Sequence, residues 1–288
     1  MSSDTTSPET ARREWDLAPA GRGALRLRVC EWGPTDAGTP VVVLHGFLDQ
    51  GAAWDRVARG LGRRVVAPDQ RGHGRSDHVG AGGWYHFWDY VGDVDALVEH
   101  LGGRVDLVGH SMGGTVAALF AGTRPAAVRR LVLVDGLGPP DTTEQAVERA
   151  RQFLDHRRHA PVHGALADLA EASHRIRSFN GVDDADALAL AERITERHSE
   201  GLRWTWDALE RARTPSPFDA DLFVKFLAEI RAPVLSVVGG RSPFVIADWE
   251  RRAAAIPDLR REVIADAGHL LHHEAPAALT AAIREFLA

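Results

Sequence analysis

The sequence contains one cysteine, Cys30, among 288 residues. A single cysteine excludes an intramolecular disulfide and a thiolate metal cluster within one chain, and it is compatible with a reducing compartment. No apolar run approaches the roughly 18 residues of a membrane-spanning helix, and the polar N-terminal stretch lacks the apolar segment of a signal peptide. We therefore expect a cytoplasmic protein without a membrane partner.

Positive charge is also in short supply. Lys and Arg number 34 against 40 Asp and Glu, which gives a net charge of −6. Nucleic-acid binding needs a clustered basic excess, so we expect no nucleic-acid partner. The hydrophobic content of 44% suffices for one full core, as expected of one catalytic domain that carries an insertion. These features favour a small-molecule substrate and do not determine the oligomeric state.

Short runs of β-branched and aliphatic residues recur along the chain, a pattern typical of parallel strands that are buried on both faces. Two strands are expected between Glu14 and Trp32, with a turn around Gly21 and Gly23, and another over Arg261–Ile264. The five remaining runs cover residues 41–44, 65–67, 105–108, 131–134 and 234–238.

Helical patterns lie between these runs. Apolar residues recur at helical spacing from Val91 to Leu101, and again behind Pro276 near the end of the chain. Strands that alternate with helices predict an α/β fold with a mostly parallel, doubly wound sheet of about eight strands.

The alternation stops between about Gly138 and Pro217, where charged residues and histidines alternate with Ala and Leu in helix-like stretches. We predict an inserted helical cap, or lid, over residues 138–217 and a core domain made of residues 1–137 and 218–288. The cap enters after one core strand and leaves before the next, so it should cover the carboxyl ends of the strands, where open α/β sheets bind ligands.

The clearest chemical signal is the segment Gly109-His110-Ser111-Met112-Gly113-Gly114, between a predicted strand and an apolar helix. A sharp strand-to-helix turn strains the backbone of the central serine, and the positions two before and two after it must be glycine to avoid clashes. The turn would present the Ser111 hydroxyl at a helix N-terminus, where the helix dipole favours developing negative charge. Ser111 is therefore the candidate nucleophile.

Acyl transfer also needs donors to the developing oxyanion, by convention the backbone N–H after the nucleophile and one from the loop after an earlier strand. Met112 supplies the first donor. Phe47 is the candidate for the second, because strand 41–44 continues directly into His45-Gly46-Phe47.

Serine is a weak nucleophile at neutral pH and requires a base, for which histidine is suited. Of the 14 histidines, His269 follows strand 261–264 through a short loop and precedes the last helix. This position gives the chain order nucleophile, acid, histidine, and the preceding glycine allows a tight loop. His272 and His273 are the competing candidates.

The carboxylate that would orient the catalytic histidine is the least determined of the candidate catalytic residues. In this architecture the carboxylate usually follows the strand after the cap, yet Ser242 occupies that place and cannot hold a negative charge against an imidazolium. Asp135, at the end of strand 131–134, is the preferred substitute, and Asp248 is the alternative. A dyad or another carboxylate also stays open, and Asp135 could instead have only a structural hydrogen-bonding role.

Five segments together resemble the α/β-hydrolase superfamily: HGFLDQGAAWD, DQRGHGRSD, GHSMGG, LVLVDGLGPP and AGHLLHHEAP. The resemblance extends from Trp15 to Leu287. Within the superfamily, residues 201–235 and LVLVDGLGPP resemble the serine hydrolase-like group, whose substrates are poorly defined.

The resemblance implies the α/β-hydrolase fold, Ser111 as nucleophile, His269 as base, and Phe47 and Met112 as oxyanion donors. In relatives that resemble haloalkane dehalogenases the acid follows the strand that matches Asp135. Those enzymes and epoxide hydrolases carry aspartate at the position that matches Ser111, so a serine there disfavours both chemistries.

We therefore expect an enzyme that hydrolyses a carboxylic ester or related acyl bond through an acyl-enzyme, without a metal or organic cofactor. A carbon–carbon bond hydrolase or a lactonase could use the same residues. Two other possibilities are a cofactor-free, non-hydrolytic enzyme of specialised metabolism and a ligand-binding protein on a hydrolase fold.

Overall fold

A computed structural model describes residues 12–19, 24–36, 38–199, 201–244 and 246–288 of the chain. The turn expected around Gly21 and Gly23 lies outside these residues. No helix among them is long and apolar enough to cross a bilayer.

The centre of the molecule is an eight-stranded sheet in the order β1-β2-β4-β3-β5-β6-β9-β10. Strand β2 pairs antiparallel with both β1 and β4, and all the other pairs are parallel. The prediction of a mostly parallel sheet of about eight strands is therefore confirmed. The strands are β1 (Arg13–Leu17), β2 (Leu27–Trp32), β3 (Val41–Leu44), β4 (Val65–Pro68), β5 (Val105–His110), β6 (Val128–Val134), β9 (Val234–Gly239) and β10 (Leu259–Ile264).

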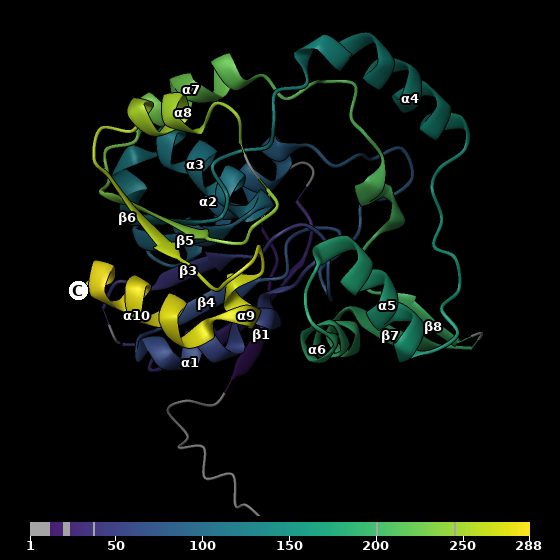
Figure 1. Ribbon diagram of the computed structural model, residues 1–288, viewed down its shortest axis with the longest axis horizontal. Coiled ribbons are helices and arrows are strands. Elements are labelled where there is room, and N and C mark those ends of the chain that lie inside the picture. The colour runs from purple at the N-terminus through teal and green to yellow at the C-terminus, as the bar shows by residue number, and fades with distance from the viewer. Residues whose placement is uncertain (1–11, 20–23, 37, 200, 245) are drawn as a thin grey trace, which may run out of the picture.

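Helices cover both faces of the sheet (Figure 1). One hydrophobic cluster joins the sheet to α2, α3 and α7, and a second cluster joins the opposite face to α1 and α10. Because each face is covered, the central strands are apolar throughout rather than alternating. The helices are α1 (Asp55–Leu61), α2 (Phe87–His100), α3 (Met112–Thr123), α7 (Ala220–Glu229), α8 (Trp249–Ala255), α9 (Leu271–Glu274) and α10 (Pro276–Leu287).

The segment between β6 and β9 carries α4 (Ala146–Arg158), α5 (Leu169–Asn180) and α6 (Asp184–Ile194). It also carries an antiparallel hairpin of β7 (Thr195–His198) and β8 (Gly201–Trp204), where we had predicted helix. The hairpin was missed because half of its strand residues are exposed and polar, so no apolar alternation marks it. The division into core and cap at residues 138 and 217 stays a prediction.

Candidate active site

The turn at Ser111 joins β5 to α3. Ser111 has φ 51° and ψ −115°, a conformation that L-residues rarely adopt. A Cβ on Gly109 would lie 2.4 Å from the carbonyl oxygen of Gly113, and a Cβ on Gly113 would lie 2.4 Å from that of Leu44. The glycines at these two positions therefore permit the strained turn, as the sequence predicted.

Three side chains from distant parts of the chain meet at this turn. His269 Nε2 lies 3.0 Å from Ser111 Oγ, and His269 Nδ1 lies 2.6 Å from Asp135 Oδ2. Both side chains are shielded from water, with exposures of 7% for His269 and 4% for Asp135. This arrangement lets Asp135 accept from Nδ1–H, which leaves Nε2 free to accept the serine proton.

Asp135 reaches His269 because it directly follows β6, where its φ is 45°. Ser242, which occupies the usual place of the acid, donates a 2.5 Å hydrogen bond to Asp135 Oδ2. Sequence reasoning missed this contact, although the proximity of both residues to neighbouring strand ends was a signal that could have indicated it. Asp248 lies elsewhere and binds Arg252 with both carboxylate oxygens.

The two candidate oxyanion donors lie beside the nucleophile. Met112 is the first residue of α3, so its N–H has no acceptor within the helix. Phe47 is on the loop after β3, and a Cβ on the preceding Gly46 would lie 3.3 Å from Ser111 Cβ. The structure therefore brings the loop that carries Phe47 close to Ser111, and Met112 follows Ser111 directly in the chain.

Two buried, neutral histidines hold the Phe47 loop in position. Leu48 N–H donates to His73 Nε2 over 3.2 Å, and Gln70 N–H donates to His45 Nε2 over 2.9 Å. Burial lowers the pKa of His73 to about 3, and burial likewise lowers the pKa of His45. Neutral rings are required here, because only a deprotonated nitrogen can accept these amide protons.

The loop that contains His73 is itself buried and internally bonded. Asp69 accepts from Gly51 N–H at 2.8 Å and from Arg75 N–H at 2.9 Å, while Ser76 Oγ donates to Asp69 O. The segment DQRGHGRSD therefore has a structural role under the Phe47 loop.

The competing histidines do not face the serine. His272 Nε2 lies 3.0 Å from Asp49 Oδ2, and its ring stacks on Trp54 at a centroid distance of 4.7 Å. Burial lowers the pKa of His273 to about 3. Of the three neighbouring histidines, the structure brings His269 to Ser111.

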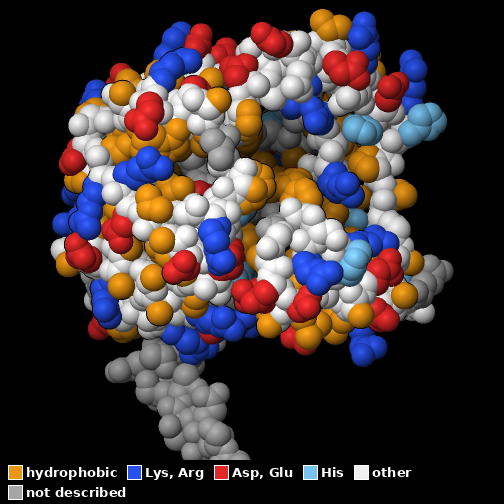
Figure 2. Space-filling view, viewed as in Figure 1, with side chains coloured by type: hydrophobic (Ala, Val, Ile, Leu, Met, Phe, Trp, Pro, Cys, Tyr) orange, Lys and Arg blue, Asp and Glu red, His pale blue; other side chains and the backbone are white. Residues whose placement is uncertain are grey.

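The space around His269 is partly open and apolar. The Phe244 ring lies 4.1 Å from the His269 ring, centre to centre, and is 51% exposed. Figure 2 shows a hollow lined by hydrophobic side chains in the middle of this face, between the core and the segment that carries α5 and α6. Such a hollow suits a small substrate with apolar parts.

Known proteins resemble this chain in sequence and in structure. The profile of the alpha/beta hydrolase fold matches residues 39–167. A serine hydrolase-like protein of Danio rerio is 29% identical, over 98% of this chain and 90% of its own. The 2-(acetamidomethylene)succinate hydrolase of Mesorhizobium japonicum is 28% identical, over 100% of this chain and 99% of its own.

A solved structure is also similar over nearly its full length. The thioesterase domain from the curacin biosynthetic pathway superposes with a TM-score of 0.83 at 32% identity, over 95% of this chain and 99% of that domain. An overlap of this extent must take in most of the sheet and most of the segment between β6 and β9.

Proposed function

The chain belongs to the α/β-hydrolase family, and from this we propose that it is a serine hydrolase that cleaves a carboxylic ester or related acyl bond of a small molecule. The observation that carries the proposal is the pair of contacts made by His269, at 3.0 Å to Ser111 Oγ and at 2.6 Å to Asp135 Oδ2. A nucleophile, a base and an orienting carboxylate are the groups that acyl transfer through a serine requires.

In the first half-reaction His269 Nε2 removes the hydroxyl proton of Ser111 as Oγ attacks the substrate carbonyl carbon. Asp135 accepts from Nδ1–H, which holds the tautomer and stabilises the imidazolium that forms. The same proton then passes from Nε2 to the leaving group, and an acyl-enzyme forms on Ser111 Oγ. In the second half-reaction His269 activates water, which releases the acid and regenerates the serine.

The negative charge of the tetrahedral intermediate would be stabilised by the backbone N–H groups of Phe47 and Met112. The position of both amides beside Ser111 supports this assignment. One such donor typically contributes about 100- to 1000-fold in rate. Because they are backbone groups, the Phe47 side chain can vary without loss of the donor.

The names of the relatives support acyl chemistry as the reaction class. One is a hydrolase of 2-(acetamidomethylene)succinate, and another is a thioesterase domain. The first name is that of a hydrolase and the second that of a thioesterase, which is why we extend the proposal from esters to related acyl bonds.

The proposal is tested by turnover of p-nitrophenyl esters, from acetate to longer acyl chains. We expect Ser111→Ala and His269→Ala to lose on the order of 10⁶-fold in kcat, and Asp135→Asn about 10⁴-fold. Asp248→Asn is the matched control, since it makes the same chemical change at the other candidate acid and should stay within about threefold of wild type. Wild-type inactivity would refute ester hydrolysis, and full activity in Ser111→Ala would refute the role of Ser111 as nucleophile.

Labelling of the serine separates an enzyme from a ligand-binding protein on the same fold. A fluorophosphonate should modify the wild type with a stoichiometry of one at Ser111, and His269→Ala should slow this reaction strongly because the serine loses its base. An unreactive Ser111 would support the ligand-binding alternative. Turnover that persists in Ser111→Ala would instead indicate a non-hydrolytic reaction.

A further inference from the structure

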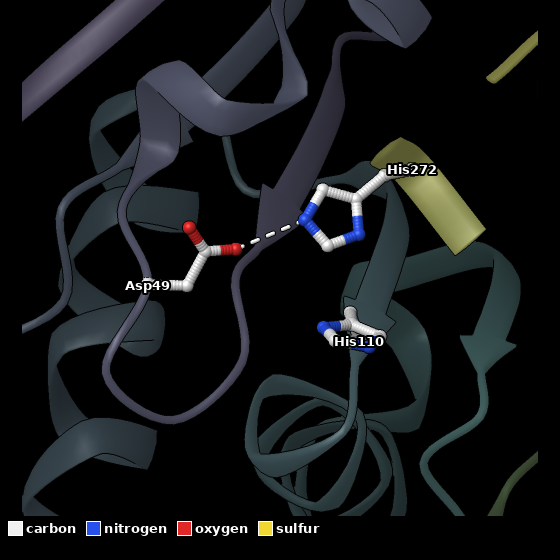
Figure 3. Close-up of side chains that lie close together, drawn as sticks. All are labelled: Asp49, His110 and His272. Atoms are coloured by element: carbon white, nitrogen blue, oxygen red, sulfur yellow. Dashed lines mark hydrogen bonds and ion pairs between the residues drawn. The ribbon is translucent and has the colours of Figure 1, made fainter. Parts of the chain in front are cut away.

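Three polar side chains other than Ser111, His269 and Asp135 lie close together, as Figure 3 shows. Asp49 comes from the loop after β3, His110 from the end of β5, and His272 from α9. One ligand atom from each residue lies within 4.8 Å of the others. All three are buried, with exposures of 7%, 1% and 0%.

Each of the three residues carries a buried polar atom without a hydrogen-bond partner among the described residues. The atoms are Asp49 Oδ1, His110 Nδ1 and His272 Nδ1. An unsatisfied buried polar atom typically costs about 1–3 kcal/mol, so a ligand that engages these side chains would stabilise the fold.

A hydrogen bond on the far side of the His110 ring orients that ring toward the other two residues. His110 Nε2 donates to the carbonyl oxygen of His269 at 2.9 Å, so Nδ1 presents its lone pair to the cluster. A Cβ on Gly46 would lie 2.6 Å from this Nδ1, so the glycine keeps the adjacent space open. Metal-binding histidines are commonly oriented in this way, by donating the other ring N–H to a carbonyl or carboxylate.

We propose that Asp49, His110 and His272 bind a first-row divalent transition-metal cation, for which Zn²⁺ is the reference. Two imidazole nitrogens and one carboxylate oxygen form a ligand set typical of Zn²⁺, whereas Mg²⁺ and Ca²⁺ prefer oxygen ligands alone. The cation takes the place of the hydrogen between His272 Nε2 and Asp49 Oδ2, and the neutral ring then carries its hydrogen on Nδ1.

The spacing of the ligands is close to what the cation requires. Zinc at about 2.0–2.1 Å from each ligand needs ligand atoms roughly 3.3 Å apart. His272 Nε2 and Asp49 Oδ2 are already 3.0 Å apart, and the His110 nitrogen, within 4.8 Å, needs only to move closer. Binding therefore requires a small adjustment of one ring and no change of fold.

The site is stabilising rather than reactive. Its ligands are 61 and 162 residues apart in the chain, so they come together only in the folded protein and the cation binds that state selectively. His110 precedes Ser111, and His272 follows His269 by three residues. The cation thus crosslinks the two segments that carry the proposed nucleophile and base. The proposed reaction does not use the metal.

The test is metal binding by the full chain after removal of metals with a chelator. With Zn²⁺ added and the excess dialysed away, elemental analysis should find one equivalent per chain. At a free Zn²⁺ concentration of 100 times the Kd, the Tm should rise by roughly 5 °C, while Mg²⁺ should not change it. Asp49→Asn and His272→Gln should both lose the bound equivalent and the shift in Tm.

His273→Gln is the matched control. His273 lies on the same helix, is equally buried and also has an unpartnered ring nitrogen, but it is outside the ligand set. It should retain one equivalent, and circular dichroism establishes that each variant is folded. The proposal is overturned if wild type binds no zinc, if Asp49→Asn and His272→Gln keep it, or if His273→Gln loses it equally.

Discussion

The Ser242 hydroxyl donates to Oδ2 of Asp135, the same oxygen that lies 2.6 Å from His269 Nδ1. Ser242 follows β9 and Asp135 follows β6, and these two strands are neighbours in the sheet. Ser242 therefore occupies the usual position of the acid after β9, and it orients Asp135, the carboxylate that follows the adjacent strand β6. Two donors on one oxygen restrict the rotation of the Asp135 carboxylate and align it with His269.

We predict that Ser242→Ala lowers kcat by about tenfold with little change in KM, because a hydrogen bond to a charged group contributes about 1.5–3 kcal/mol and part of it is recovered by water. Ester turnover over a range of substrate concentrations measures both constants. Ser216→Ala, at an exposed position, is the control. An unchanged kcat would mean that His269 alone orients Asp135.

The glycines of the Ser111 turn give a prediction about stability. Gly113→Ala would place a Cβ 2.4 Å from one backbone carbonyl oxygen and 2.5 Å from the next, so the turn cannot form without displacing β3. We expect a loss of about 3 kcal/mol or more in the free energy of unfolding, measured by urea denaturation. Gly92→Ala is the control, because Gly92 lies in α2 with open space around it and alanine should add about 0.5–1 kcal/mol. Equal stability of the two variants would contradict the packing argument.

The core strands and the turn at Ser111 could be predicted because their signals are local. The run Val41–Leu44 coincides with β3, and Val105–Val108 lies within β5. The requirement for glycine at positions 109 and 113 follows from backbone sterics alone. The placement of His269 beside Ser111 followed from chain order, which the fold class determines. The roles of these residues stay predictions until the variants are assayed.

The contacts that could not be predicted depend on packing between distant segments. The sequence left Asp135 and Asp248 both open as the acid, because a carboxylate at either position is compatible with the same strand pattern. The contact of Asp135 with His269 is what favours Asp135, and because the two residues are 134 positions apart no local pattern indicates it. The contact between Asp49 and His272 joins residues 223 positions apart, and no local pattern indicates it either.

Arg252 is a buried cation that joins the core to the start of the segment after β6. It is 0% exposed, pairs with Asp248, and donates from Nη1 to the carbonyl oxygens of Leu137 and Pro139 at 2.9 Å each. We expect Arg252→Met to lower the free energy of unfolding by about 2–3 kcal/mol. This loss is smaller than that expected when one partner of a fully buried ion pair is removed, because Asp248 is partly exposed.

Chemical denaturation measures this loss. Arg251→Met is the matched control on the same helix, since Arg251 is half-exposed and its ion pairs should contribute less than about 1 kcal/mol. If both variants are equally stable, the contacts of Arg252 with the two carbonyls do not contribute to stability.

Glu210 links the segment after β8 to the core through a buried carboxyl group. Tyr90 Oη donates to its two oxygens at 2.6 and 2.8 Å, and His73 Nδ1 lies 3.5 Å away. Burial raises the pKa of Glu210 to about 8 from its ordinary 4.5. The side chain is therefore protonated in the folded protein at neutral pH and ionised in the unfolded chain.

This difference determines the sign of a pH effect on stability. Between pH 4.5 and about 8 the folded protein binds one proton more than the unfolded chain, so the contribution of Glu210 to the free energy of unfolding falls as pH rises and is constant above that range.

Glutamine cannot ionise and keeps an acceptor for Tyr90. We therefore expect Glu210→Gln to gain stability relative to wild type from pH 5 to pH 8, by a few kcal/mol at most. Urea denaturation at both pH values gives the double difference, and Glu144→Gln, at an exposed site, should give none. If the free energies of unfolding of wild type and Glu210→Gln change in parallel with pH, the Glu210 carboxyl group ionises equally in the folded and unfolded states. The Tyr90 contact would then have to stabilise a buried charge.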